Sequence, residues 1–161
     1  MKTTWVPLFL ACASAAQAAT VPVPSADPTA DVLYAIRMVE SGNRYADCPT
    51  GRHGEQGPYQ FRREVWHQYT HAPFSAARTS LADEIARRHY AWLAQCLRRG
   101  GQTPTPWAVA AAWNGGVAAV LRNRITAGTR NYATRVTNLV ESQAQVRAAL
   151  TPRFRIDLAN N

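Results

Sequence analysis

The sequence predicts a mainly α-helical protein built as a single compact helical domain. Apolar residues recur with a period near 3.6 in several segments, and glycine and proline separate these segments. No run of alternating apolar and polar residues is long enough to indicate a sheet. The chain is 47% hydrophobic, and about 140 residues remain beyond an N-terminal leader, enough for one core but not for two.

The first eighteen residues are typical of a secretory signal peptide. Lys2 gives a positive start, residues 5–16 are mostly apolar, and residues 16–18 read Ala-Gln-Ala, a cleavage pattern. This stretch is too short to span a membrane and no later one is longer, so we expect no integral membrane segment. The sequence therefore predicts a periplasmic or secreted protein. Lipid attachment at Cys12 is an alternative.

Three further boundaries follow from composition. Residues 19–28 are proline-rich and should form a flexible N-terminal segment. We expect the folded domain over residues 29–150 and a C-terminal tail over residues 151–161.

The first helix should begin at about Pro28, with Asp27 as its N-cap, and end at Gly42. Leu33 lies on its apolar face. At 100° per residue, Glu40 projects only about 20° away from Leu33. The helix therefore carries a carboxyl group on its apolar stripe.

The next stretch should be irregular. Residues 44–57 are rich in glycine, proline and charge, which predicts a loop, with room for a small hairpin between residues 44 and 61. A short helix fits residues 62–69, and Pro73 closes it.

A third helix should run from a capping box at Ser80-x-x-Asp83 to Gly100. Its expected inner positions are Leu81, Ile85, Trp92 and Cys96. A fourth helix, over residues 107–114, follows Thr105 and Pro106 and is apolar enough to be buried. Two more are expected over residues 117–125 and 132–150, divided by Gly128.

Two cysteines remain after removal of a signal peptide, Cys48 and Cys96. In an oxidising compartment they can pair in only one way, so we expect a disulfide between them. A metal-binding role is disfavoured because no His or Cys lies at ligand spacing from either thiol.

Four short motifs follow one another along the chain. Residues 40–43 read Glu-Ser-Gly-Asn, 57–61 read Gly-Pro-Tyr-Gln-Phe, 112–116 read Ala-Trp-Asn-Gly-Gly, and 131–136 read Asn-Tyr-Ala-Thr-Arg-Val. In this order they resemble the lysozyme superfamily, above all its lytic transglycosylase (SLT-type) domains, with some similarity to invertebrate-type lysozymes. The resemblance covers about Val32 to Leu139 and implies an α+β lysozyme-like fold.

By this resemblance Glu40 would be the catalytic acid of an enzyme that cleaves peptidoglycan. Ser41 would orient Glu40, and Gln60 and the backbone around Tyr59 would line the cleft. Asn114 would contact substrate or hold the cleft wall, and Tyr132 would hydrogen-bond near the acid. The chain departs from the transglycosylase pattern at Pro58-Tyr59, where Leu-Met is usual, and at Trp113 and Gly115, where Tyr and Ala are usual.

Glycosidic cleavage needs an acid that is still protonated near neutral pH, and a glutamate on an apolar face meets that need because burial raises its pKa. A hydrolase of the two-carboxylate type needs a second acid. Asp47 and Glu55 lie in the adjacent loop, and Glu55 is the better candidate. Without a second acid, the resemblance implies the transglycosylase route, in which Glu40 serves as acid and then as base and a 1,6-anhydromuramyl end forms.

Three further functions are compatible with the sequence: a hydrolytic muramidase, a chitin-type glycosidase, or an inactive glycan-binding or assembly protein of the same fold.

The net charge of the chain indicates its surroundings. Removing Lys2 from the formal net charge of +8 leaves +7, carried by arginines, which suits the acidic cell envelope. Scattered arginines and the absence of a nucleic-acid motif argue against nucleic acid. The four histidines show no metal-ligand spacing, so we expect no metal or cofactor, and a monomer acting on peptidoglycan glycan strands.

Overall fold

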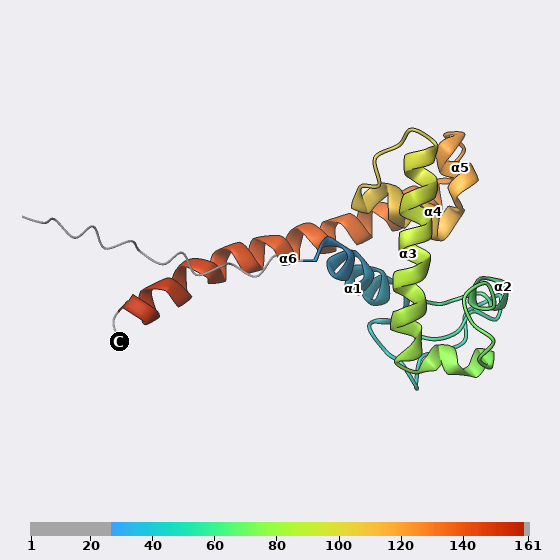
Figure 1. Cartoon of the computed structure of the whole chain (residues 1–161), viewed down its shortest axis with the longest axis horizontal. Coiled ribbons are helices and arrows are strands. Elements are labelled where there is room, and N and C mark those ends of the chain that lie inside the picture. The colour runs from blue at the N-terminus through green and yellow to red at the C-terminus, as the bar shows by residue number, and fades with distance from the viewer. Residues whose placement is uncertain (1–26, 160–161) are drawn as a thin grey trace, which may run out of the picture.

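The computed structural model describes the backbone of residues 27–159 and the side chains of residues 27–149. The predicted signal peptide, the lipid-attachment alternative at Cys12 and almost all of the N-terminal segment lie outside these residues. The described chain is mainly helical, as predicted. Six α-helices and one 3-10 helix form a rounded body, from which the end of the last helix projects (Figure 1).

Helix α1, Pro28–Ser41, begins and ends where its local signals place it. The Asp27 carboxylate accepts a hydrogen bond from the Thr29 N–H at 2.9 Å. At the other end Gly42 adopts a left-handed conformation, with a φ of 65°, and its N–H donates to the Met38 carbonyl. The buried face of α1 packs against α3, α4 and α6 and thereby fixes the helix end that carries Glu40.

The predicted hairpin is reduced to a single antiparallel bridge between Gln56 and Phe61. Within residues 27–159 no strand forms, so the α+β detail of the expected fold is not seen there. Helix α2 is also shorter than expected, Arg63–Trp66, and the 3-10 helix η1, Phe74–Arg78, follows it.

Helix α3, Leu81–Arg99, runs through the middle of the body (Figure 1). The predicted capping box is wrong: Ser80 has helical dihedral angles and makes no side-chain cap. The Thr79 hydroxyl instead accepts from the Leu81 N–H at 3.3 Å. The predicted register is also partly wrong, because Trp92 is 45% exposed and the buried stripe runs one position away, through Ala82, Ile85, Ala86, His89, Leu93 and Leu97.

Helix α4, Pro106–Gly115, is buried as predicted, and the Thr105 hydroxyl caps it by accepting from the Ala108 N–H at 3.2 Å. Its alanines allow close packing against α3, α5 and α6. Helix α5, Val117–Leu121, is shorter than expected. Helix α6, Ala127–Ala159, is longer, and Gly128 lies inside its first turn instead of dividing two helices.

The expected disulfide is not formed, since Cys48 and Cys96 are both free thiols. Arg78, just before α3, donates to the carbonyl of Cys48, so the Cys48 loop lies beside the beginning of α3. Cys96 belongs to the last turns of the same helix. The rise from Leu81 to Cys96 is about 22 Å, whereas a disulfide needs Cα atoms within about 7 Å.

One carboxylate joins three segments of the body. Asp83, on α3, accepts hydrogen bonds from the hydroxyl of Tyr59 at 2.7 Å, from the hydroxyl of Tyr45 at 2.9 Å and from the Arg37 guanidinium at 3.1 Å. Arg37 lies on α1 and also stacks over the Tyr45 and Tyr59 rings. These contacts hold the loop between α1 and α2 against both α1 and α3; we call these four residues the Asp83 cluster.

We predict that Asp83→Ala lowers the free energy of unfolding by about 3 kcal/mol, because three partly buried donors lose a charged acceptor. Urea unfolding followed by circular dichroism measures this. Glu84→Ala is the matched control, since the Glu84–Arg88 pair is more than half exposed on both sides and should cost less than about 0.5 kcal/mol. Equal losses for the two variants would contradict a special role for Asp83.

Candidate active site

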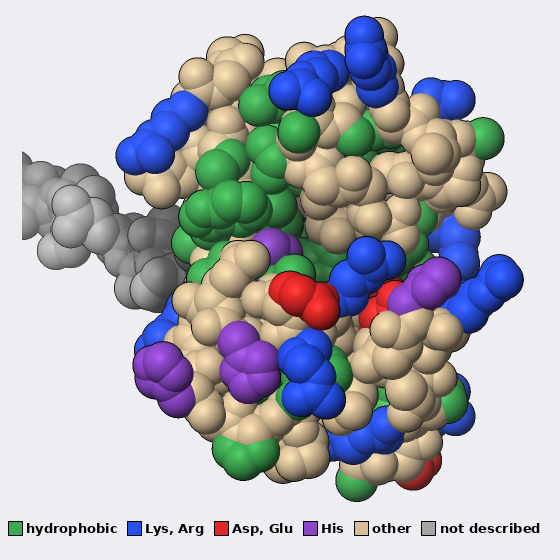
Figure 2. All heavy atoms as spheres, turned by 90° about the vertical axis from the view of Figure 1, so that its right-hand side faces the viewer, with side chains coloured by type: hydrophobic (Ala, Val, Ile, Leu, Met, Phe, Trp, Pro, Cys, Tyr) green, Lys and Arg blue, Asp and Glu red, His purple; other side chains and the backbone are tan. Residues whose placement is uncertain are grey.

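A cavity of about 310 Å³ opens between the end of α1, the loop before α2, the middle of α3 and the end of α4. Figure 2 shows the hollowed face, where hydrophobic side chains lie between an upper and a lower half and charged and histidine side chains gather along the lower edge. Glu40, Glu55, Gln60, His89, Trp113 and Asn114 are among its lining residues. The cavity is thus built by segments far apart in the sequence.

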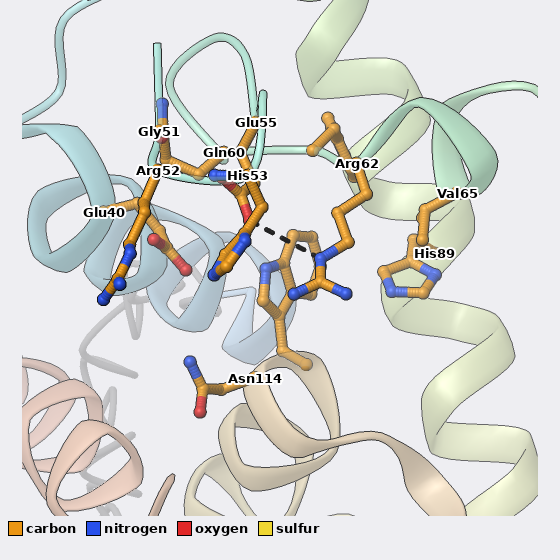
Figure 3. A pocket seen from close by; sticks show the side chains of 12 residues that line it. Glu40, Gly51, Arg52, His53, Glu55, Gln60, Arg62, Val65, His89 and Asn114 are labelled. Carbon is orange, nitrogen blue, oxygen red and sulfur yellow. Dashed lines mark hydrogen bonds and ion pairs between the residues drawn. The ribbon is translucent and has the colours of Figure 1, made fainter. Parts of the chain in front are cut away.

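Glu40 reaches the cavity from the last turn of α1 (Figure 3). Burial in the apolar wall raises its pKa from 4.5 to about 7, because the charged form loses hydration. The hydrogen bond from Tyr132 and the charge of Arg135 lower the pKa, while the charge of Glu55 raises it. Desolvation is the largest effect, so Glu40 can hold a proton near neutral pH.

Tyr132 lies in the second turn of α6 and is buried. Its hydroxyl donates to Glu40 Oε1 at 2.8 Å, across 92 positions of sequence. Burial and the neighbouring Glu40 carboxylate raise the pKa of Tyr132, so the phenol stays protonated and acts only as a donor. This contact fixes one carboxyl oxygen of Glu40 and leaves the other without a hydrogen bond from Tyr132.

Glu55 lines the same cavity with the opposite protonation behaviour. Its carboxylate accepts from the His53 N–H at 2.8 Å and pairs with Arg62 at 3.5 Å. Burial raises its pKa, but hydrogen bonds from the loop backbone and the charges of His53 and Arg62 outweigh this and leave the pKa lowered. The cavity therefore contains one carboxyl that is still partly protonated near pH 7 and one that is ionised there.

Gln60 and Asn114 also line the cavity. Gln60 has a left-handed backbone, with a φ of 47°, and its side-chain amide donates to the Gly57 carbonyl at 3.0 Å, which braces the loop. Asn114 lies at the end of α4, across from Arg52 and His53 of the loop (Figure 3). Its carbonyl oxygen accepts from the Thr129 hydroxyl at 2.9 Å, which leaves the amide NH₂ available to a ligand.

Ser41 and Tyr59 do not line the cavity. Both are buried. The Ser41 hydroxyl lies 3.0 Å from the Pro58 carbonyl oxygen and 3.1 Å from that of Arg37, so it joins the end of α1 to the Gly-Pro-Tyr-Gln segment. Tyr59 belongs to the Asp83 cluster. Their positions suit support of Glu40 and the loop, and the buried side chain of Tyr59 does not reach the cavity. Asp47 is exposed and does not line the cavity.

Sequence reasoning missed three aromatic groups of the cavity wall. His89 lies on α3 and Trp113 on α4, with their rings in an edge-on contact at 4.8 Å. Phe61 packs against Trp113 at 5.7 Å. Burial lowers the pKa of His89 to about 4, so the imidazole is neutral above that pH. The misplaced register of α3 concealed His89, whereas Trp113 stood inside a motif and could have been found.

The side chains in the described part of the chain bring together no group of three or more His, Cys, Asp or Glu residues fit to hold a metal ion. Within the same residues, no helix combines the length and apolarity needed to cross a membrane. No family model, curated protein or solved structure matches the chain.

We predict that Glu40→Gln is more stable than the unmodified protein at pH 8 and equally stable below pH 4.5. The folded-state pKa of Glu40, about 7, lies above the unfolded value. The native state therefore binds the extra proton, and stability falls as pH rises from about 4.5 to 7. The loss is about 3 kcal/mol, and Gln does not undergo it. Urea unfolding at both pH values tests this, and a pH-independent difference would show that Glu40 is not desolvated.

Proposed function

We propose that this protein is a glycosidase that cleaves the β-1,4 bond between N-acetylmuramic acid and N-acetylglucosamine in peptidoglycan, with Glu40 as its acid. One observation carries the proposal: the Glu40 carboxyl, with a pKa of about 7, lines a cavity and accepts a hydrogen bond from the buried Tyr132. Such a group can protonate the leaving oxygen of a glycosidic bond at neutral pH.

The order of the four motifs supports the lytic transglycosylase route. Glu40 gives its proton to the glycosidic oxygen as the bond from the muramyl anomeric carbon breaks. The resulting carboxylate then takes the proton of the sugar's own 6-hydroxyl, whose oxygen attacks that carbon and gives a 1,6-anhydromuramyl end. Glu40 ends the cycle protonated, and no water is consumed. Asn114, with its available amide, is placed to bind a sugar acetamido or hydroxyl group.

A hydrolytic muramidase is the second candidate, and Glu55 favours it. An acid with a raised pKa and a carboxylate with a lowered pKa share the cavity, the division of roles that a two-carboxylate glycosidase uses. In that reaction the Glu55 carboxylate would attack the anomeric carbon or activate a water. Its bonds to His53 and Arg62 are the rival explanation, because they also give it a purely structural role in the loop.

The products and two variants separate these reactions. We expect Glu40→Gln to lower turnover of purified peptidoglycan at least a hundredfold, since general acid catalysis supplies about 10²–10⁴-fold. Mass spectrometry of wild-type products should give anhydro ends. Glu55→Gln should then reduce the rate only a few-fold. Reducing ends together with a hundredfold loss in Glu55→Gln would instead assign the hydrolase.

Glu64→Gln is the matched control, because Glu64 is an exposed glutamate of α2 that does not line the cavity. It should retain full turnover. Binding of glycan strands with no release of products by the wild-type protein would refute the enzymatic proposal and favour a glycan-binding or assembly protein.

The pH dependence of turnover gives a further test of Glu40. Because the protonated acid is the active form, the rate should fall above about pH 7. The hydrogen bond from Tyr132 lowers this pKa, so Tyr132→Phe should move the alkaline limb to higher pH while it reduces the maximal rate. Tyr34→Phe, on the exposed face of α1, should leave the profile unchanged. An unmoved limb in Tyr132→Phe would mean that another group sets it.

A further inference from the structure

A second hollow adjoins the candidate active site. It is an open groove of about 620 Å³ between the second half of α3 and helix α5. Trp92 and Cys96 form one wall, Val117 and Leu121 form the other, and Arg99 lies at its end. Two large apolar side chains, Trp92 and Leu121, are exposed here, at 45% and 37%. Exposed apolar side chains that gather in one place mark a binding surface more often than chance.

The groove continues from the catalytic cavity through two shared walls. On α3, Trp92 stacks on His89, with ring centroids 5.8 Å apart and planes within 12°, and His89 lines the cavity. On the opposite wall, Asn114 lines the cavity and Gly116 lines the groove. Figure 2 shows hydrophobic side chains that extend along the hollow between the upper and lower halves of this face. The two hollows are therefore neighbouring parts of one surface.

The floor of the groove is free of side chains at two places. Gly116 has a φ of 84°, a backbone conformation that L side chains rarely adopt, and this turn lets α5 start immediately after α4. At Gly100 a Cβ atom would lie 2.4 Å from Leu121. A side chain at position 116 would strain the backbone, and one at position 100 would displace the Leu121 side chain, so both glycines favour the present shape of the groove.

We propose that this groove binds additional sugars of the glycan strand whose cleavage is catalysed at Glu40. Trp92 supplies an aromatic platform, because its indole lies nearly parallel to the His89 ring beside it and nearly half of the residue is exposed. The apolar C–H face of a pyranose ring packs on such a surface. Among the described residues that line the groove, Arg99 alone is charged, and it suits the lactyl and stem-peptide carboxylates of peptidoglycan. The protein would therefore prefer long strands to short fragments.

This inference rests on the proposed function, and substrate length tests it separately. We expect Trp92→Ala to raise KM for long glycan strands roughly fivefold to tenfold, as loss of an aromatic contact would, and to leave turnover of a tetrasaccharide unchanged. Trp92→Phe should restore much of the affinity. Val146→Ala removes an exposed apolar side chain from α6 instead and should affect the turnover of neither substrate. Equal losses on both substrates would overturn the proposal.

Cys96 gives a readout that needs no turnover. It is partly exposed and lines the groove, whereas Cys48 is buried. In the Glu40→Gln variant of the mature chain, long strands should slow alkylation of Cys96 by iodoacetamide, and a tetrasaccharide should not. Peptide mass spectrometry locates the label, with Cys48 as the internal reference.

The outcomes distinguish the two proposals. Protection of Cys96 together with no cleavage by the wild-type protein would refute the glycosidase and retain the glycan groove. Cleavage with neither protection nor length dependence would refute the groove alone. Protection that appears without glycan as protein concentration rises would assign the groove to self-association and overturn the sugar proposal.

Discussion

The carboxylate of Asp83 is the contact on which the rest of the site depends. The loop from Gly42 to Arg62 contains almost no regular structure, and its backbone alone could not hold a cavity wall. Asp83 fixes it by accepting from Tyr45 and Tyr59, two side chains of that loop, while Arg37 ties the same carboxylate to α1. Burial raises the pKa of Tyr59 and Asp83 raises it further, so the phenol remains a donor at all physiological pH values. A loop of this composition thereby becomes a fixed wall.

The same body sets the chemistry of Glu40 through a balance of opposing effects. Desolvation favours the neutral carboxyl, and Tyr132 favours the charged one. Desolvation is the largest effect on the pKa of Glu40. The charge of Glu55 also raises this pKa, and the charge of Arg135 lowers it. A general acid that must later serve as a base benefits from such a balance, because neither protonation state is strongly preferred near pH 7.

Capping residues in the sequence correctly predicted where α1 begins and ends and where α4 begins. Asp27, Pro28 and Gly42 bound α1, and Thr105 and Pro106 begin α4, because caps act within a few residues. The register of α3 was predicted correctly at Ile85 but one position off at Trp92, which was assigned to the core although it lies at the surface. Contacts such as that between Glu40 and Tyr132 join residues 92 positions apart, and no periodicity reveals them. The expected disulfide is absent for the same reason, since counting cysteines carries no information on how far apart the fold holds Cys48 and Cys96.

Helices α1 and α6 lie side by side and run in opposite directions (Figure 1). A polar contact joins them near each end of α1. Glu40 meets Tyr132 at one end, and Asp31 meets Arg147, 2.6 Å away, at the other. The two contacts are about 13 Å apart along the axis of α1. The hydrogen bond between Tyr132 and Glu40 is partly buried. The contact between Asp31 and Arg147 is an ion pair at the surface, which dissolved salt screens. Because the buried face of α1 also packs against α3, α4 and α6, screening of the surface ion pair by salt should loosen the start of the helix and leave the end that carries Glu40 in place.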